Sequence, residues 1–195
     1  MVIIVYQMVN MVRGGKEVRM SKSSGEFVTL RELVDEVGPD CIRFMMLTRT
    51  SDVTLNFDLD LAVEQSDRNP VFYVQYAHTR IAGVLRRAAE VGIESNDAVD
   101  LSLLTHPSEL ALIRKMLTLP ETVELAARTF GTHHLTTYAT ELASLFHAFY
   151  RDCRIVSTDL DDREITQSRL VLSRASKLVL ARVLHLMGMT APDRM

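Results

Sequence analysis

The feature that most constrains the fold is the segment between residues 69 and 92, which carries helix signals at both ends. Asn69 can cap a helix, Pro70 suits a first helical position that needs no N–H, and Gly92 can adopt the left-handed conformation that ends one. At 100° per residue, one side of this helix is a predicted core stripe, formed by Val74, His78, Ile81 and Leu85. The segment therefore predicts a buried amphipathic helix around which the chain is organised.

A second side of the same helix gathers aromatic and basic residues, namely Phe72, Tyr76, Arg80, Gly83 and Arg87. Aromatic rings can stack unpaired bases and guanidinium groups can bind phosphates, so this face suits a single-stranded RNA loop. An alternative is that the two aromatic residues widen the buried stripe while the stem of Arg80 lies along it. The residues of this helix by themselves leave both interpretations open.

Helix signals continue through the rest of the chain. Pro107 and Pro120 each predict the start of a helix, because a proline inside a helix costs about 3 kcal/mol. Two long helical periods of apolar residues follow, over residues 132–153 and 165–186. The composition, with 47% hydrophobic residues and only eight glycines, is typical of packed helices. We therefore predict a mainly α fold in which residues 67–195 form a helical bundle.

The first 66 residues predict a smaller unit of strands and short helices. Residues 1–6 are apolar and predict a buried strand whose partners lie upstream. Residues 13–25 are rich in glycine, serine and basic side chains, which predicts a polar loop with local positive charge. A capping box at residues 29–32 predicts the start of a short helix, and the alternation at residues 53–57 predicts an extended strand.

Composition and cysteine usage exclude several classes of function. The formal net charge of −3 is no general signature of nucleic-acid binding, so RNA binding must depend on a local basic patch, and DNA is not an expected partner. Cys41 and Cys153 stand far apart in no paired spacing, which predicts a reduced, cytoplasmic protein without a metal site. No apolar run is long enough to cross a membrane, and the first residues lack the features of a signal peptide.

Five short motifs occur in order along the chain: Arg19–Ser23 (Arg-Met-Ser-Lys-Ser), Asp40–Phe44, Asn56–Asp60, Asn69–Arg80 and Ala191–Met195. The first resembles the Lys-Met-Ser-Lys-Ser signature of the class I aminoacyl-tRNA synthetases. The third and fourth resemble the arginyl-tRNA synthetases in particular, and the last is similar to the carboxyl end of that family. This resemblance extends over essentially the whole chain.

The resemblance implies an ATP-binding loop made by Arg19, Met20, Ser21, Lys22 and Ser23. In the family this flexible loop closes over ATP, and its catalytic lysine, here Lys22, stabilises the pyrophosphate leaving group by its charge. The chain has Arg19 where the signature has its first lysine. The positive charge is kept, but arginine and lysine bind phosphate with different geometry, so the implied role rests mainly on Lys22.

The resemblance also implies that the helical bundle is an anticodon-binding domain. In the family, the residues corresponding to Tyr76 and Arg80 lie against the anticodon loop of tRNA, with the terminal methionine, here Met195, near them. The aromatic and basic face described above adds Phe72 and Arg87 to this predicted tRNA site. His78 belongs to the apolar stripe instead, and we expect it to be a structural histidine of the core.

The implied organisation is a carboxyl-terminal remnant of a catalytic domain in residues 1–66, followed by the anticodon-binding domain in residues 67–195. The full-length parent would be an enzyme that joins arginine to tRNA-Arg using ATP and Mg²⁺. A His-x-Gly-His-type motif, which contacts ATP in class I synthetases, is absent from the sequence. We therefore expect this chain by itself to be inactive in arginine activation.

Two other functions remain open at this point. The cysteinyl- and methionyl-tRNA synthetases share the lysine loop and a helical anticodon domain, although Gln75–Arg80 and the terminal Arg194–Met195 argue against them. An independent helical bundle that binds another protein is the third possibility, and it predicts an exposed apolar groove with no affinity for tRNA.

Overall fold

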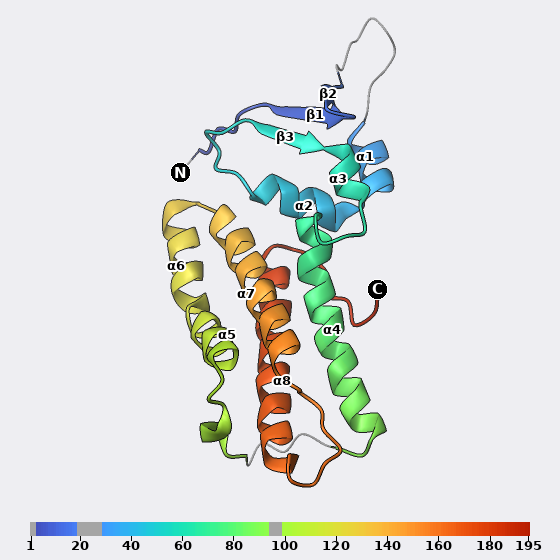
Figure 1. Ribbon diagram of the computed structural model, residues 1–195. Helices are drawn as coiled ribbons and strands as arrows, with labels where there is room; N and C mark the ends of the chain where they lie inside the picture. The colour runs from blue at the N-terminus through green and yellow to red at the C-terminus, as the bar shows by residue number, and fades with distance from the viewer. Residues whose placement is uncertain (1–2, 19–28, 94–98) are drawn as a thin grey trace, which may run out of the picture.

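The computed structural model describes residues 3–18, 29–93 and 99–195. Its strands are β1 (Val9–Arg13), β2 (Lys16–Glu17) and β3 (Leu55–Asp58). Its helices are α1 (Leu30–Val37), α2 (Pro39–Leu47), α3 (Leu59–Val63), α4 (Pro70–Glu90), α5 (Pro107–Leu117), α6 (Leu119–Thr129), α7 (His133–Asp152) and α8 (Arg163–Leu186), with a 3-10 turn at Leu101–Leu103. Figure 1 shows the small sheet and helices α1 to α3 at one end of the bundle formed by α4 to α8. The predicted mainly α fold is confirmed.

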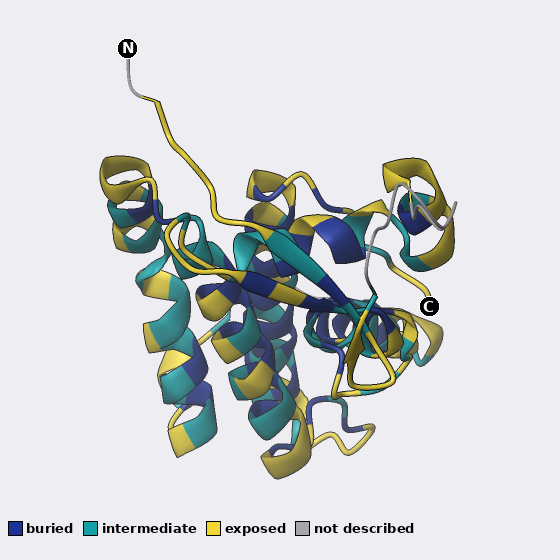
Figure 2. Ribbon diagram, turned by 90° about the horizontal axis from the view of Figure 1, so that it is seen from above, coloured by how far each residue is buried: buried dark blue, intermediate teal, exposed yellow. Residues whose placement is uncertain are grey.

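Helix α7 occupies the middle of the bundle, where it packs against α4, α5, α6 and α8. Its inward side carries fully buried aromatic and aliphatic residues, which are Tyr138, Leu142, Phe146 and Phe149. Burying one such side chain stabilises the fold by about 1.5–3 kcal/mol. Seen from above in Figure 2, the buried positions lie on the sides of the helices that face one another. Within the described ranges, no helix combines the length and the apolar character that crossing a membrane requires.

Helix α4 forms as its sequence predicts. The Asn69 side chain accepts a hydrogen bond from the backbone N–H of Val71, and Pro70 occupies the first helical position. Beyond the last turn, Gly92 has a φ of 73°, in the left-handed region that glycine adopts without strain. The predicted core stripe is buried at Val74, His78 and Ile81 and half-buried at Leu85. Local signals thus define both the ends and the orientation of this helix.

The sheet has the strand order β2-β1-β3. Strand β1 pairs in parallel with β3, from Val9 opposite Leu55 to Val12 opposite Asp58. It also pairs with β2 in an antiparallel hairpin that turns at Gly14 and Gly15, which both have positive φ. This is the geometry of a tight two-residue hairpin turn. The prediction of a continuous polar loop over residues 13–25 is therefore wrong at its start, where the chain pairs with itself.

Within the run predicted as a buried strand at residues 1–6, residues 3–6 form no strand in this structure, and residues 1–2 lie outside the described residues. Ile3, Val5 and Tyr6 are exposed, and the strand begins only at Val9. The physical reason is pairing: β1 lies beside β3 and places Met11 in the core, whereas no strand pairs with residues 3–6 in the described part of the chain. An apolar run alone does not determine where a ladder forms.

A polar junction connects α2, α4 and the carboxyl-terminal tail. The carboxylate of Asp40 in α2 accepts a hydrogen bond from Nε2 of Gln75 in α4 (2.9 Å) and from the backbone N–H of Thr190 (3.0 Å). The same Gln75 nitrogen donates to the carbonyl oxygen of Thr190 at 3.1 Å. Three segments that are distant in the sequence therefore share one set of hydrogen bonds, which fixes the small sheet unit against the bundle.

The tail after Gly188 runs back along α4 and is held there by side chains. Nδ1 of His78 lies 2.8 Å from the carbonyl oxygen of Pro192, and the Thr79 hydroxyl donates to the same oxygen at 2.9 Å. Lys177 of α8 forms an ion pair with Asp193 at 2.7 Å. Burial lowers the pKa of His78, so its ring is neutral and donates through Nδ1. The prediction that His78 is a hydrogen-bonded core histidine is confirmed.

Candidate nucleic-acid interface

Four residues of α4 and α7 form a stacked row, defined here as Phe72, Tyr76, Arg80 and Tyr150. The rings of Phe72 and Tyr76 are nearly parallel, with centroids 5.8 Å apart and an interplanar angle of 10°. The guanidinium carbon of Arg80 lies 4.6 Å from the centre of the Tyr76 ring and 4.9 Å from that of Tyr150. The spacing of four residues places the first three on one side of α4, and Tyr150 approaches from α7. A cation in contact with two rings is held in a defined orientation.

Two hydrogen bonds fix the guanidinium of Arg80 further. Its Nη2 donates to the Tyr76 hydroxyl at 2.9 Å, and its Nη1 lies 3.3 Å from Nδ1 of His147. The imidazole must be unprotonated at Nδ1 to accept this bond. Burial, together with the charge of Arg80, lowers the pKa of His147 to about 4, against a smaller opposing effect of hydrogen bonding to the backbone carbonyl oxygen of Tyr73. His147 is therefore neutral at pH 7 and acts as an acceptor for Arg80.

This shifted pKa predicts a stability change with pH. The unfolded chain binds a proton on His147 near the ordinary pKa of 6.5, whereas the folded protein does so only at about 4. The free energy of unfolding should thus fall by about 2 kcal/mol between pH 7 and pH 5 on account of this residue. Urea unfolding at both pH values, with His147→Gln as the matched variant, measures the effect. Equal pH dependence in the two proteins would contradict the assignment.

Three residues of the stacked row, Tyr76 and Arg80 from α4 and Tyr150 from α7, line a groove between α4 and the end of α7. We define the groove by its lining residues, Tyr76, Arg80, Gly83, Val84, Arg87, Tyr150, Cys153, Arg154, Ile155 and Val156. It encloses about 570 Å³. Three guanidinium groups and two tyrosine rings lie along it, and the Glu90 carboxylate approaches Arg87 only at 3.9 Å on an exposed surface, where such a pair is weak. The groove is thus positively charged and aromatic despite the negative net charge of the chain.

The structure brings together most of the predicted tRNA-binding residues. Tyr76 (37% exposed), Arg80 and Arg87 line the groove, and Phe72 stacks on Tyr76 at its end. Met195 lies elsewhere, in a separate hollow that it shares with Phe72 and Gln75 on the other side of the row. The common face on α4 is as predicted, and the RNA contacts of these five residues stay predictions.

The predicted ATP-binding loop, Arg19, Met20, Ser21, Lys22 and Ser23, lies outside the described residues. The prediction for the residues that follow the loop is confirmed. The Thr29–Glu32 capping box forms with both of its reciprocal hydrogen bonds, and α1 begins there. The catalytic role of Lys22 therefore stays a prediction from the resemblance alone.

Sequence analysis did not identify the second wall of the groove. Tyr150 and Arg154 face α4 from the end of α7 and the segment after it, and His147 lies behind Arg80. The apolar period of α7 assigned Phe146 and Phe149 to the core but left Tyr150 without a role. Tyr150 is 43% exposed beside the buried Phe149, and it becomes part of a binding surface only through the packing of α7 against α4.

A buried ion pair supports this second wall from behind. The carboxylate of Glu109, at the start of α5, is fully buried and accepts from Nε of Arg169 in α8 at 2.6 Å. Its other oxygen accepts from the backbone N–H of His106 at 2.9 Å. Arg169 also donates to the carbonyl oxygen of Arg154 at 3.0 Å. The position of the groove-lining segment therefore depends on a charge pair in the interior.

Comparison with known proteins decides which family this architecture represents. Residues 74–195, which include the groove, the ion pair and the tail, match the DALR anticodon binding domain. The chain belongs to this family. The matched residues begin inside α4 and extend to Met195, so the stacked row from Tyr76 onward is part of the DALR domain.

Proteins similar to the whole chain carry the same kind of domain within a longer sequence. An arginine–tRNA ligase of Dehalococcoides mccartyi (strain CBDB1) is 51% identical over 192 residues, which are 98% of this chain and 34% of that protein. An arginine–tRNA ligase of Heliobacterium modesticaldum is 48% identical over 199 residues, or 99% of this chain and 35% of that protein. The chain with its DALR domain thus spans about a third of the length of these curated relatives.

The fold is also shared with solved structures. A putative arginyl-tRNA synthetase from Campylobacter jejuni superposes with a TM-score of 0.83 at 28% identity, over 97% of this chain and 40% of that one. The Thermus thermophilus arginyl-tRNA synthetase gives a TM-score of 0.74 at 25% identity, over 97% of this chain and 35% of that one. The arrangement of the small sheet unit beside the DALR domain therefore recurs in these structures.

Proposed function

We propose that this chain is the tRNA-binding part of an arginine–tRNA ligase and that its groove holds the anticodon loop of tRNA-Arg. The observation that supports this most strongly is the groove itself, where two tyrosine rings and three arginines line one hollow of a DALR domain. The relatives described above are named arginine–tRNA ligases, which favours arginine over the cysteinyl and methionyl alternatives.

The groove offers the two kinds of contact that an unpaired RNA loop needs. The exposed parts of the Tyr76 and Tyr150 rings provide aromatic surface for contact with bases, and Arg80, Arg87 and Arg154 provide donors for phosphates. Because Arg80 is already held by two rings and two hydrogen bonds, little conformational freedom is lost when it meets RNA. Preorganisation of this kind raises affinity without additional contacts.

The complete protein would join arginine to tRNA-Arg with ATP and Mg²⁺, as the resemblance implies. Lys22, with Arg19, Met20, Ser21 and Ser23, would stabilise the pyrophosphate leaving group in that reaction. On this proposal Met195 and Phe72 border the RNA site from the second hollow. The alternative, a helical bundle that binds another protein, predicts a groove lined by apolar residues. The three arginines that line this groove argue against it.

Direct titration tests the proposal. The chain should bind tRNA-Arg roughly tenfold tighter than an unrelated elongator tRNA at the same salt concentration, because base contacts in the groove add about 1–3 kcal/mol each to the common phosphate attraction. Fluorescence anisotropy with labelled tRNA, repeated at two salt concentrations, measures the contribution of the base contacts and that of the phosphate attraction. Equal Kd values for the two tRNAs would exclude specific recognition, and absence of binding would favour the protein-interaction alternative.

A further inference from the structure

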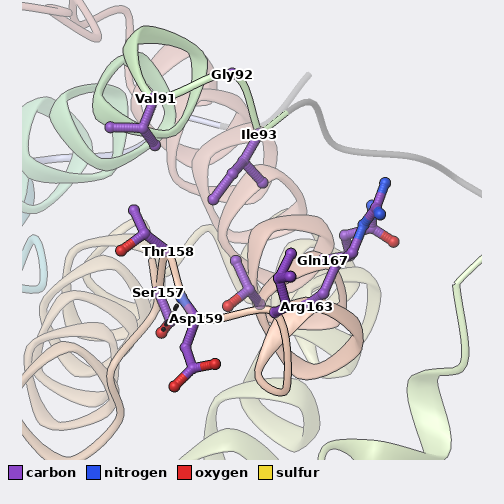
Figure 3. Close-up of a pocket in the computed structure, with 10 residues that line it drawn as sticks. Val91, Gly92, Ile93, Ser157, Thr158, Asp159, Arg163 and Gln167 are labelled. Carbon is purple, nitrogen blue, oxygen red and sulfur yellow. Dashed lines mark hydrogen bonds between the residues drawn. The ribbon is translucent and has the colours of Figure 1, made fainter.

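Another hollow, distinct from the one that contains Met195, lies beyond the groove toward the far end of the bundle. We call it the end pocket and define it by its lining residues, Val91, Gly92, Ile93, Ser157, Thr158, Asp159, Leu160, Arg163, Thr166 and Gln167. It encloses about 490 Å³, within the usual range of about 300–1,000 Å³ for small-molecule sites. Figure 3 shows the end of α4 on one side of this pocket and the Ser157–Asp159 turn and α8 on the other.

The end pocket and the groove lie on one seam of the molecule. On the α4 side, Val84 and Arg87 line the groove and Val91 lines the end pocket, at spacings that keep all three on the same face. On the other side, residues 153–156 of the groove run directly into residues 157–160 of the end pocket. The rise along α4 from Arg87 to Val91 is about 6 Å. An RNA strand that lies in the groove therefore reaches the pocket within one or two nucleotides.

The floor of the end pocket contains a hydroxyl group without a partner. Thr166 is 1% exposed, and its Oγ1 makes no hydrogen bond within the described residues. Other hydroxyls of the bundle behave differently: Ser168 donates to the carbonyl oxygen of Glu164, and Thr140 donates to that of Thr136. A buried polar group without a partner destabilises a fold, so native proteins rarely keep one unless something else satisfies it. The Thr166 hydroxyl is thus an unsatisfied polar group at the lining of the pocket.

The remaining lining residues indicate the chemistry of that group. Val91 and Ile93 provide an apolar wall and Gln167 adds a polar side chain, whereas the Ser157 hydroxyl is already paired, donating to Asp162 at 2.7 Å and accepting from the backbone N–H of Asp159 at 3.3 Å. The carboxylate of Asp159 repels phosphate but accepts hydrogen bonds from amino groups of bases. Arg163 at the start of α8 carries the opposite charge, which suits a phosphate beside the pocket rather than inside it. A flat, uncharged group with polar edges, attached to a charged backbone, fits this distribution.

We propose that the end pocket receives one unstacked nucleoside of the RNA loop whose neighbours lie in the groove, with the Thr166 hydroxyl bonded to its base or ribose. This inference rests on the proposed RNA binding and extends it by a specificity-determining site. Single-stranded loops are recognised in this way, by bases that leave the stack and enter pockets of the protein. Thr166 contributes a hydrogen bond that no residue of the groove can provide at this distance.

Thr166→Val removes the hydroxyl while keeping the shape of the side chain, and Thr140→Val is the matched control because that hydroxyl is paired within α7. Each protein is titrated with anticodon stem-loop RNAs that carry a single abasic or a single 2′-deoxy loop position. At one position the substitution should weaken binding to the unaltered protein and to Thr140→Val about fivefold more than it weakens binding to Thr166→Val, the effect of one hydrogen bond. Thr166→Ser should restore the full response.

Thermal unfolding provides an independent readout. Because the hydroxyl is unpaired, Thr166→Val should keep or raise the Tm, whereas Thr140→Val should lower it. A lowered Tm for Thr166→Val would show that the hydroxyl has an internal partner and would overturn the inference. The inference would also be overturned if each RNA substitution weakened binding equally at every position in all variants. If the unaltered chain binds the stem-loops and Tyr76→Ala weakens that binding, but Thr166→Val has no effect, only the end pocket is refuted. If no stem-loop binds, the proposed function and this inference fail together.

Discussion

Replacing Arg80 by alanine should weaken the binding of tRNA-Arg roughly 10- to 100-fold, the largest effect expected from a single change in the groove. The guanidinium contacts the rings of Tyr76 and Tyr150 and is hydrogen-bonded to Tyr76 and His147. Its loss removes a charge and also frees both tyrosine rings to leave their stacking positions. Each base stacked on an aromatic side chain is worth about 1–3 kcal/mol, so two displaced rings account for a change of this size.

Two matched variants separate these contributions. Arg80→Lys keeps the charge but loses the planar contact with the rings. Its affinity for tRNA-Arg should lie between that of Arg80→Ala and that of the unaltered protein. Arg86→Ala removes the same charge from an exposed position of α4 that does not line the groove, and it should change the Kd by less than about twofold. If Arg80→Ala and Arg86→Ala weaken binding equally, the contribution of Arg80 is only general electrostatic attraction.

Replacing Arg169 by methionine should lower the free energy of unfolding by about 3–5 kcal/mol, because the fully buried carboxylate of Glu109 would lose its charged partner. For a chain of this length the Tm should fall by roughly 10 °C. Urea unfolding at pH 7 measures the free energy directly. The same change releases the carbonyl oxygen of Arg154, so the groove should also bind tRNA less tightly.

The double variant Glu109→Gln with Arg169→Met tests the cause of this loss. It removes both charges, so it should be more stable than Arg169→Met alone, although less stable than the unaltered protein. Arg68→Met serves as a control for an exposed pair, since Arg68 lies 3.6 Å from Glu64 at the surface and should contribute less than about 1 kcal/mol. A loss below 1 kcal/mol for Arg169→Met would show that the carboxylate finds another partner.

Features encoded by neighbouring residues could be predicted from the sequence. The Asn69 cap, the Thr29–Glu32 capping box and the stop at Gly92 each involve residues within a few positions of one another, and each forms as expected. The face shared by Tyr76, Arg80 and Arg87 also follows from the helical period alone. These features do not depend on how distant segments pack.

Features that depend on distant packing could not be predicted in this way. The bond between Arg80 and His147 joins positions 67 apart, and it exists only because α4 and α7 lie side by side. Among the described residues no strand lies beside the apolar run at residues 3–6, whereas Val9–Arg13 pairs with a strand 46 positions away. A strand is defined by its partner, and local sequence does not identify that partner. For the same reason the sequence revealed one wall of the groove and not the other.

The hydrogen bonds of Asp40 bear on where this molecule can be divided. They join Asp40 to positions 35 and 150 residues away, and Gln75 and Thr190, 115 residues apart, are also hydrogen-bonded to each other, so the sheet unit and the carboxyl tail lose their mutual support together. A polypeptide cut down to residues 67–195 would keep Gln75 and Thr190 but leave their donors without the carboxylate they share. We therefore expect that the predicted domain boundary at residue 67 is not a boundary of cooperative unfolding. We expect the whole chain to melt in one transition, with the sheet unit and the carboxyl tail unfolding together.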